Sequence, residues 1–108
     1  MRVRFSNPRL HNALDGQMLE ELLALCRELD RDEATRFVVF TGEGASFMAG
    51  VDLNSDAMSV DDDPASARVR QRMGHDLIRH LRDLEQITVA AVNGACVGAG
   101  LAIAIACD

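Results

Sequence analysis

The chain has 108 residues, enough for one small domain or for part of a larger one. Hydrophobic residues make up 48% and charged residues 26% of it, a balance that permits a hydrophobic core and argues against intrinsic disorder. The formal net charge of −6, from 17 acidic and 11 basic residues, disfavours binding to nucleic acid or anionic lipid, so a phosphate-bearing ligand would have to be held by a local feature.

The first elements expected along the chain are a short edge strand and an amphipathic helix. Residues 3–5 suit a strand that Pro8 and the two residues before it end, since proline has no N–H for a β ladder. Asp15 is a good N-cap, and the apolar spacing after it predicts a helix over residues 16–29 with one buried face. The apolar positions are Met18, Leu19, Leu22, Leu23, Cys26 and Leu29.

A second strand and an unusual loop follow. Residues 37–41 (FVVFT) predict a buried strand, after which Gly42 and Gly44 turn the chain away. In the next stretch, residues 45–53, Gly50 lies between small and apolar residues, where a plain surface loop would be polar. We therefore expect the backbone at Gly50 to be buried or covered by a ligand.

A polar connection and a second helix come next. Residues 55–64 contain the carboxylates of Asp56, Asp61, Asp62 and Asp63. They could bind a hard cation, but the calcium-loop spacing is missing and a solvated loop fits better. Residues 65–84 repeat apolar residues at helical spacing and predict a helix. His75 and His80 on this helix have no partner at metal-ligand spacing, so we expect surface or boundary histidines.

The last stretch, residues 88–108, predicts a strand, a glycine turn and a helix. Residues 88–92 form a short apolar run with β-branched residues, which suits a strand buried on both faces. An Asn-Gly pair breaks the run. After Gly98 and Gly100, residues 101–107 are apolar and alanine-rich, which predicts a buried helix.

Three interpretations of this stretch stay open. A helix start presents unpaired N–H groups and the positive end of the peptide dipoles, so the turn could bind negative charge. The glycines could instead only permit tight packing of helix against sheet. Residues 87–107 also carry no charge and are long enough to cross a bilayer, although they are rich in Ala and Gly and lack aromatic residues. Along the whole chain, the alternation of strands and helices favours an α/β fold with a mainly parallel sheet.

The cysteines and the first residues bear on the cellular compartment. Cys26, Cys96 and Cys107 are odd in number, lack metal-ligand spacing and lie in apolar surroundings, which indicates buried reduced thiols, with a nucleophilic cysteine as the alternative. The sequence starts without the apolar core of a signal peptide. We expect a cytoplasmic protein.

Three segments occur in a recognisable order: NPRLHNAL at residues 7–14, FMAGVDL at residues 47–53 and AAVNGACVGAGLAIAIACD at residues 90–108. Together, with an amphipathic helix in each interval, they resemble the crotonase superfamily, the enoyl-CoA hydratase and isomerase family. The resemblance implies a crotonase-like α/β spiral of ββα units. It also implies that residues 1–108 are the N-terminal portion of such a domain, truncated after the glycine-turn helix, with the C-terminal helical part absent.

The resemblance further assigns two backbone donors, at Val51 and Ala99. In the family, the N–H after the glycine of the AGxD segment and the N–H in the middle of the glycine turn point at the thioester oxygen of an acyl-CoA. Two residues depart from the family pattern. Ala99 replaces a glycine, which keeps the N–H but would strain a left-handed backbone. Ala102 stands where hydratases carry a glutamate, and alanine cannot transfer a proton.

The resemblance also implies a CoA site in the first two segments and the glycine turn. Arg9 matches a basic position near the CoA phosphates, although it could equally be a solvated loop arginine. Asn54 replaces a lysine that hydratases often have, which removes one phosphate contact. The other matching positions are Leu10, Ala49, Asp52, Leu53 and Gly98.

The sequence therefore predicts an acyl-CoA-processing enzyme that stabilises a thioester enolate in a backbone oxyanion hole, without clear support for hydratase chemistry. The alternative is a catalytically inactive CoA-binding remnant or truncated pseudoenzyme. The partner is an acyl-CoA thioester, with coenzyme A as part of the substrate and no separate cofactor, metal, nucleic acid or membrane. By resemblance, the full-length form is expected to be a homotrimer or a dimer of trimers.

Overall fold

A three-stranded parallel sheet forms one layer of the molecule. The computed structural model describes residues 1–54 and 63–108. The sheet has the strand order β1 (Arg2–Phe5), β2 (Phe37–Gly42) and β4 (Ile87–Ala91). In its register Val3 pairs with Phe40, and Phe40 pairs with Ala90. Both strand pairs are parallel, and a helix connects the strands of each pair, as parallel pairing requires a long crossover connection.

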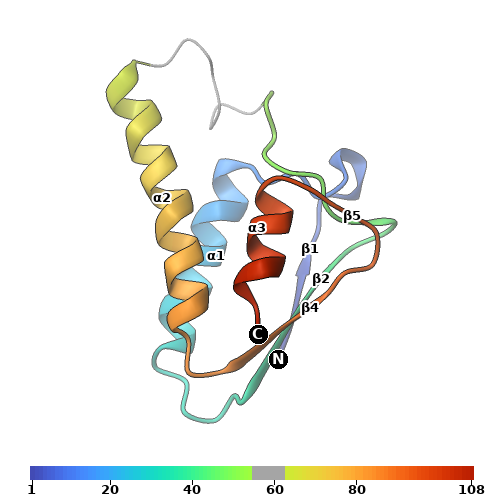
Figure 1. Ribbon diagram of the computed structural model, residues 1–108, viewed down its shortest axis with the longest axis vertical. Coiled ribbons are helices and arrows are strands. Elements are labelled where there is room, and N and C mark those ends of the chain that lie inside the picture. Colours follow the sequence, from blue (N-terminus) through green and yellow to red (C-terminus); the bar gives the residue numbers. More distant parts are fainter. Residues whose placement is uncertain (55–62) are drawn as a thin grey trace.

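In the described part of the chain, three helices form the second layer, beside the sheet (Figure 1). They are α1 (Gly16–Leu29), α2 (Pro64–Asp83) and α3 (Ala99–Ala106). A single 3-10 turn, η1 (Pro8–Leu10), precedes α1. Two short strands, β3 (Ser46–Met48) and β5 (Ala95–Cys96), pair in parallel as a second small sheet. The chain order β2, β3, α2 and then β4, β5, α3 is thus a ββα unit made twice, which agrees with the expected fold.

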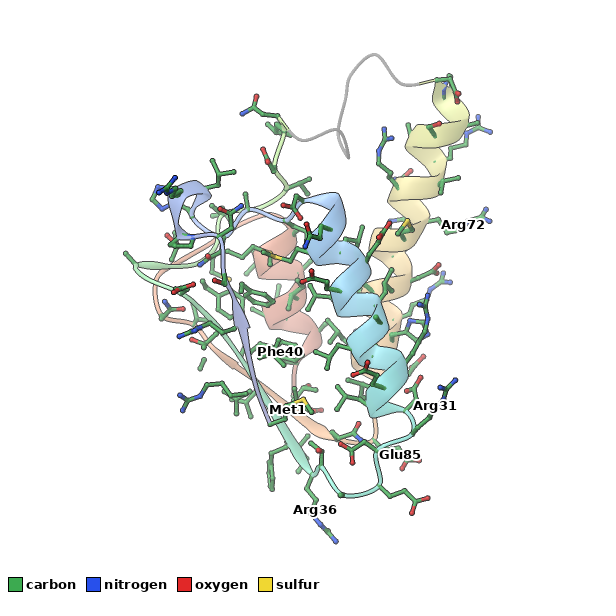
Figure 2. All side chains as sticks on the ribbon, turned by 180° about the vertical axis from the view of Figure 1, so that it is seen from behind. Met1, Arg31, Arg36, Phe40, Arg72 and Glu85 are labelled. Atoms are coloured by element: carbon green, nitrogen blue, oxygen red, sulfur yellow. The ribbon has the colours of Figure 1, made fainter. Side chains whose placement is uncertain are left out.

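The hydrophobic core lies between the sheet and the helices. Phe5, Phe40 and Phe47 meet there, with the Phe5 ring stacked on Phe40 at 6.1 Å and edge-on to Phe47 at 5.2 Å between ring centroids. Helix α1 contributes Leu22, Leu23, Cys26 and Leu29, and the later helices contribute Leu77, Leu81 and Ile103. Figure 2 shows the Phe40 side chain inside this layer, while Arg31, Arg36 and Arg72 lie at the periphery.

All three predicted helices are present, although α3, expected over residues 101–107, begins at Ala99 and ends at Ala106. Helix α1 begins after Asp15, whose carboxylate accepts a hydrogen bond of 2.8 Å from the Met18 N–H. Helix α2 begins at Pro64, one residue earlier than expected, because Asp63 caps it by accepting from the N–H groups of Ala65 and Ser66. Proline at the first helical position loses no hydrogen bond.

The prediction of full burial is wrong for the second strand, the last strand and the last helix. In β2, Val38 and Phe40 are buried but Phe37 is exposed, and in β4, Thr88 is buried but Val89 is exposed. In α3, Ile105 is 71% exposed. The physical reason is that the described residues place helices against only one face of the sheet, so alternate strand residues face outward.

The short strands β3 and β5 were not expected from the sequence, because runs of two or three residues carry no periodic signal.

Two other expectations concern the polar loop and the last stretch of the chain. The predicted solvated loop with Asp56, Asp61 and Asp62 lies outside the described residues. Across residues 1–54 and 63–108, no helix is both long and apolar enough to span a bilayer.

Candidate functional site

Two glycine bends from distant parts of the chain touch each other. Gly50 has φ 96° and Gly98 has φ 54°, conformations that residues with a Cβ rarely adopt. A Cβ added to Gly98 would lie 3.3 Å from the Gly50 Cα, and a Cβ added to Gly50 would lie 3.6 Å from the Val97 carbonyl oxygen. Val51 and Ala99, which directly follow these glycines, are therefore brought close to each other by the contact.

The backbone on either side of Val51 is hydrogen-bonded to Leu14. The Leu14 N–H donates to the Gly50 carbonyl at 2.7 Å, and the Asp52 N–H donates to the Leu14 carbonyl at 2.9 Å, which together form an isolated parallel bridge. Successive amides of an extended chain point to opposite sides, so the Val51 N–H points away from Leu14. Within the described part of the chain, this N–H donates no hydrogen bond.

The Ala99 N–H is likewise unpaired. Ala99 is the first residue of α3, and the first backbone bonds of this turn run from Gly100 to the Val97 carbonyl and from Ala102 to the Gly98 carbonyl, both at 3.0 Å. Over residues 1–54 and 63–108, nothing accepts from Ala99. Its φ is not positive, so the strain feared for an alanine at this position does not arise. The helix start adds positive potential at this N–H.

Gly100 has a different role from Gly50 and Gly98. A Cβ at Gly100 would meet the Met48 carbonyl oxygen at 2.4 Å and the Met48 Cβ at 2.7 Å. The helix could not approach β3 so closely with any larger residue. The packing interpretation of the glycine turn is therefore correct at this residue, and it leaves the ligand interpretation open at Gly98.

Asn12 is a buried residue near the site that the sequence analysis did not single out. Its side chain is fully buried, and its Nδ2 donates to the carbonyl oxygens of Glu43 at 3.0 Å, Ser46 at 2.8 Å and Phe47 at 3.3 Å. Its Oδ1 accepts from the Asn7 N–H at 2.9 Å. The sequence signal for Asn12 is its place before Ala13 and Leu14, inside a segment that belongs to the resemblance.

The residues expected at the CoA site are partly brought together. The Ala49 N–H donates to the His11 carbonyl at 3.0 Å, which joins the first and second segments directly. Arg9 and Leu10 lie on η1 and Leu53 is the last residue of the second segment, all three with exposed side chains. Arg9 makes no hydrogen bond or ion pair to the described residues, so its position agrees with either earlier interpretation.

Ala102 and the three cysteines are poor candidates for proton transfer or nucleophilic attack. Ala102 is exposed and lies one helical turn after Ala99, where it offers only a methyl group. Burial raises the pKa of the Cys26 thiol to about 11, and burial also raises the pKa of Cys96 and Cys107, so a nucleophilic thiolate is disfavoured at all three. In the described ranges, no group of three His, Cys, Asp or Glu side chains could hold a metal ion.

Comparison with known proteins gives a consistent result. A family model described as enoyl-CoA hydratase/isomerase matches residues 1–108. The 4-chlorobenzoyl coenzyme A dehalogenase-1 of an Arthrobacter species is 40% identical over 98% of this chain. The fatty acid oxidation complex subunit alpha of Shewanella amazonensis is 37% identical over 89% of it. The crystal structure of an enoyl-CoA hydratase from Bacillus anthracis superposes with a TM-score of 0.89, at 30% identity over 99% of the chain.

The matches cover the chain far better than they cover the relatives. The chain spans 39% of the dehalogenase, 14% of the fatty acid oxidation subunit and 41% of the Bacillus anthracis hydratase. Whatever the remaining parts of those proteins contribute has no counterpart in residues 1–108.

Proposed function

Because the chain belongs to the enoyl-CoA hydratase/isomerase family, we propose that its two glycine bends bind the thioester carbonyl oxygen of an acyl-CoA. The observation that carries the proposal is the contact between Gly50 and Gly98, each followed by a residue whose N–H donates to no described atom. Val51 and Ala99 would be the two donors of an oxyanion hole.

The chemistry of thioesters explains why such a pair is useful. Proton loss, addition or substitution next to a thioester, or on an aromatic ring conjugated with it, moves negative charge onto the carbonyl oxygen. Donors that are fixed before the reaction stabilise this charge without reorganising, and a single donor contributes about 3 to 4 kcal/mol in well-studied enzymes. The start of α3 adds a favourable dipole at Ala99.

The substrate class follows from what the relatives' names share. One relative is named for a chlorobenzoyl coenzyme A and the similar crystal structure for an enoyl-CoA, so the common element is a CoA thioester with an unsaturated acyl group. The two names belong to different reactions. We therefore propose oxyanion stabilisation as the contribution of residues 1–108, with acid and base groups supplied from elsewhere in the intact protein. A cytoplasmic location and assembly as a homotrimer or a dimer of trimers belong to the same proposal.

A second candidate function is CoA binding without catalysis. The observation that favours it is Ala102, which cannot transfer a proton at the position where hydratases of the family carry a glutamate. Both candidates predict binding of an acyl-CoA with its oxygen in the same place. They differ in turnover: the intact protein either converts a panel of unsaturated and aromatic acyl-CoA thioesters or only binds them.

The test replaces Ala99 by proline in the intact protein. Proline suits the first position of a helix and lacks the N–H, so Ala99→Pro removes one proposed donor with little effect on α3. Ala99→Gly is the matched control, because it retains the N–H. The measurement is the carbonyl stretching frequency of bound acetyl-CoA labelled with carbon-13 at the carbonyl, by infrared difference spectroscopy.

We expect the band to move to lower frequency on binding to the wild type and to Ala99→Gly, and to move less on binding to Ala99→Pro. For a protein that turns over, kcat of Ala99→Pro should fall by about 10²- to 10³-fold. An unshifted band in the wild type, or an equal shift in Ala99→Pro, would show that these amides do not bind the thioester oxygen. Weaker binding of acetylpantetheine than of acetyl-CoA would support a nucleotide subsite.

A further inference from the structure

We propose that Asn12 is a positioning residue that sets the direction of the Val51 N–H, an inference that rests on the proposed function. The side chain does not reach the two bends itself. It acts through the backbone of residues 7–14, which is hydrogen-bonded to the segment that follows β3 and carries Val51.

Both polar groups of the Asn12 side chain, the amide nitrogen and the amide oxygen, form hydrogen bonds to the backbone. Its Nδ2 donates to three backbone carbonyls around the start of β3, those of Glu43, Ser46 and Phe47. Its Oδ1 accepts from the Asn7 N–H. With no exposed surface and one acceptor bonded to the loop that contains it, the side chain joins this loop to β3 as a fixed unit.

The loop itself is wound tightly around Asn12. The Asn12 N–H donates to the Asn7 carbonyl at 2.9 Å, and the Ala13 N–H donates to the Leu10 carbonyl at 3.0 Å. His11 and Asn12 are the two non-glycine residues of the described chain with positive φ, at 52° and 57°. A left-handed pair of this kind persists only where other contacts hold it, and the Asn12 side chain supplies them.

The same loop is also hydrogen-bonded to the segment after β3 that carries the proposed donor Val51. The carbonyl of His11 accepts from the Ala49 N–H, and the N–H and carbonyl of Leu14 bond on either side of Val51. The residues that make these bonds, His11 and Leu14, stand one position before Asn12 and two positions after it in the sequence. A shift of the loop would therefore rotate or displace the Gly50–Val51 peptide.

Asn93 shows what a less specialised asparagine does in the same region. It donates to the carbonyls of Gly44 at 2.9 Å and Ser46 at 3.3 Å and accepts from the Gly42 N–H at 2.9 Å, so it also fixes the turn before β3. Its side chain is exposed, and none of its bonds reaches residues 7–14 or residues 49–52. Asn12 alone of the two connects β3 to the loop that binds around Val51.

Two substitutions separate the side chain from the backbone conformation. Asn12→Gly accepts the positive φ and removes all four side-chain hydrogen bonds. Asn12→Asp keeps the size and the acceptor for Asn7 but loses the amide that donates to the three carbonyls. If Asn12→Gly does not fold, Asn12→Asp still tests the donors.

Gln86→Ala provides the matched control. Gln86 is also a buried amide, and its Nε2 donates to the carbonyls of Leu29 and Asp32 at 3.0 Å each. It lies at the end of the molecule where α1 finishes and β4 begins, far from the glycine bends; its neighbours Arg31 and Glu85 mark this end in Figure 2. Its removal should lower stability without changing the site.

The readout is again the infrared carbonyl band of bound, carbon-13-labelled acetyl-CoA in the intact protein. We expect the band shift to shrink in Asn12→Gly and Asn12→Asp and to stay at the wild-type value in Gln86→Ala, even where the three variants have equal melting temperatures. Where turnover occurs, kcat should fall by up to about 10²-fold with little change in KM, because misplaced donors act on the transition state.

The outcomes are distinguishable. A wild-type shift that both Asn12 variants retain would overturn the positioning role and leave the proposed function intact. An equal loss of shift in Gln86→Ala would reduce the Asn12 effect to general destabilisation and would also overturn the role. A wild-type protein without any shift would overturn the proposed function and the positioning role together.

Discussion

Gly50 and Gly98 lie in contact, so close that a Cβ on Gly98 would sit 3.3 Å from the Gly50 Cα. The two residues come from different ββα units, one after β3 and the other after β5, and the pairing of β3 with β5 brings them together. The Val97 N–H donates to the Met48 carbonyl at 3.1 Å and continues this pairing toward the bends. The site is therefore a product of tertiary structure at the backbone level.

The first prediction concerns the glycine contact. Gly98→Ala should lower the free energy of unfolding by about 1 to 3 kcal/mol, because alanine at φ 54° is strained and its Cβ would press on Gly50. Gly74→Ala is the control, since Gly74 lies within α2 and a Cβ there meets nothing within 4 Å. The control should stabilise by about 0.5 to 1 kcal/mol. Urea denaturation measures both, and equal effects of the two would refute the strain at Gly98.

The second prediction concerns the pH dependence of stability. The Thr88 backbone N–H and hydroxyl both donate to Asp108 Oδ2, at 2.9 and 3.0 Å, and these bonds hold the pKa of Asp108 below its ordinary value. A carboxyl whose pKa is lowered by folding stabilises above its unfolded pKa and loses that contribution as the pH falls through the folded pKa.

Asp108→Asn should therefore be less stable than the wild type at about pH 6, and the difference should shrink as the pH is lowered from there through the folded pKa of Asp108. The measurement is the free energy of unfolding of both proteins across this range. A difference that stays constant with pH would show that the charge of Asp108 contributes nothing.

The third prediction concerns thiol reactivity. Burial raises the pKa of Cys26 to about 11, so at pH 8 only about one thiol in a thousand is ionised, and the side chain is also covered by the core. We expect Cys26, in a variant with the other two cysteines replaced by serine, to react with a thiol reagent only as fast as the protein unfolds. A variant that keeps only the half-buried Cys96 is the control and should react faster. Rapid labelling of folded Cys26 would contradict its burial.

The fourth prediction concerns the outer face of α3. Leu101 and Ile105 lie one turn apart on this helix and are 47% and 71% exposed. Contiguous exposed apolar side chains promote association, so the 108-residue chain is expected to self-associate through them. Ile105→Glu should reduce sedimenting aggregate more than Val69→Glu, which changes an exposed apolar residue on α2. Equal aggregation of the two variants would locate the association elsewhere.

Local chemistry explains which parts of the fold were predictable. Helix α1 was predicted with its correct ends because Asp15 and the apolar spacing after it act within a few residues of the chain. Gly50 was expected to be buried or covered by a ligand because its sequence neighbours are small and apolar. The structure shows that it is buried. The α/β fold followed from the alternation of strands and helices and from the resemblance.

Other features depend on partners far away in the sequence. Asn12 could not be identified from its own surroundings because its acceptors are 31 to 35 residues further along the chain. Full burial of β4 and α3 was predicted wrongly. An apolar run does not indicate whether other elements will pack against one face of the strand or helix or against both. The approach of Gly100 to Met48 likewise becomes visible only once β3 and α3 are packed.

The most direct measurement of the central claim is a crystal structure of the intact protein with a bound acyl-CoA. The account predicts that the backbone nitrogens of Val51 and Ala99 both lie about 2.7 to 3.1 Å from the thioester oxygen. A thioester oxygen bound by other groups, or one within reach of only one of these nitrogens, would contradict it.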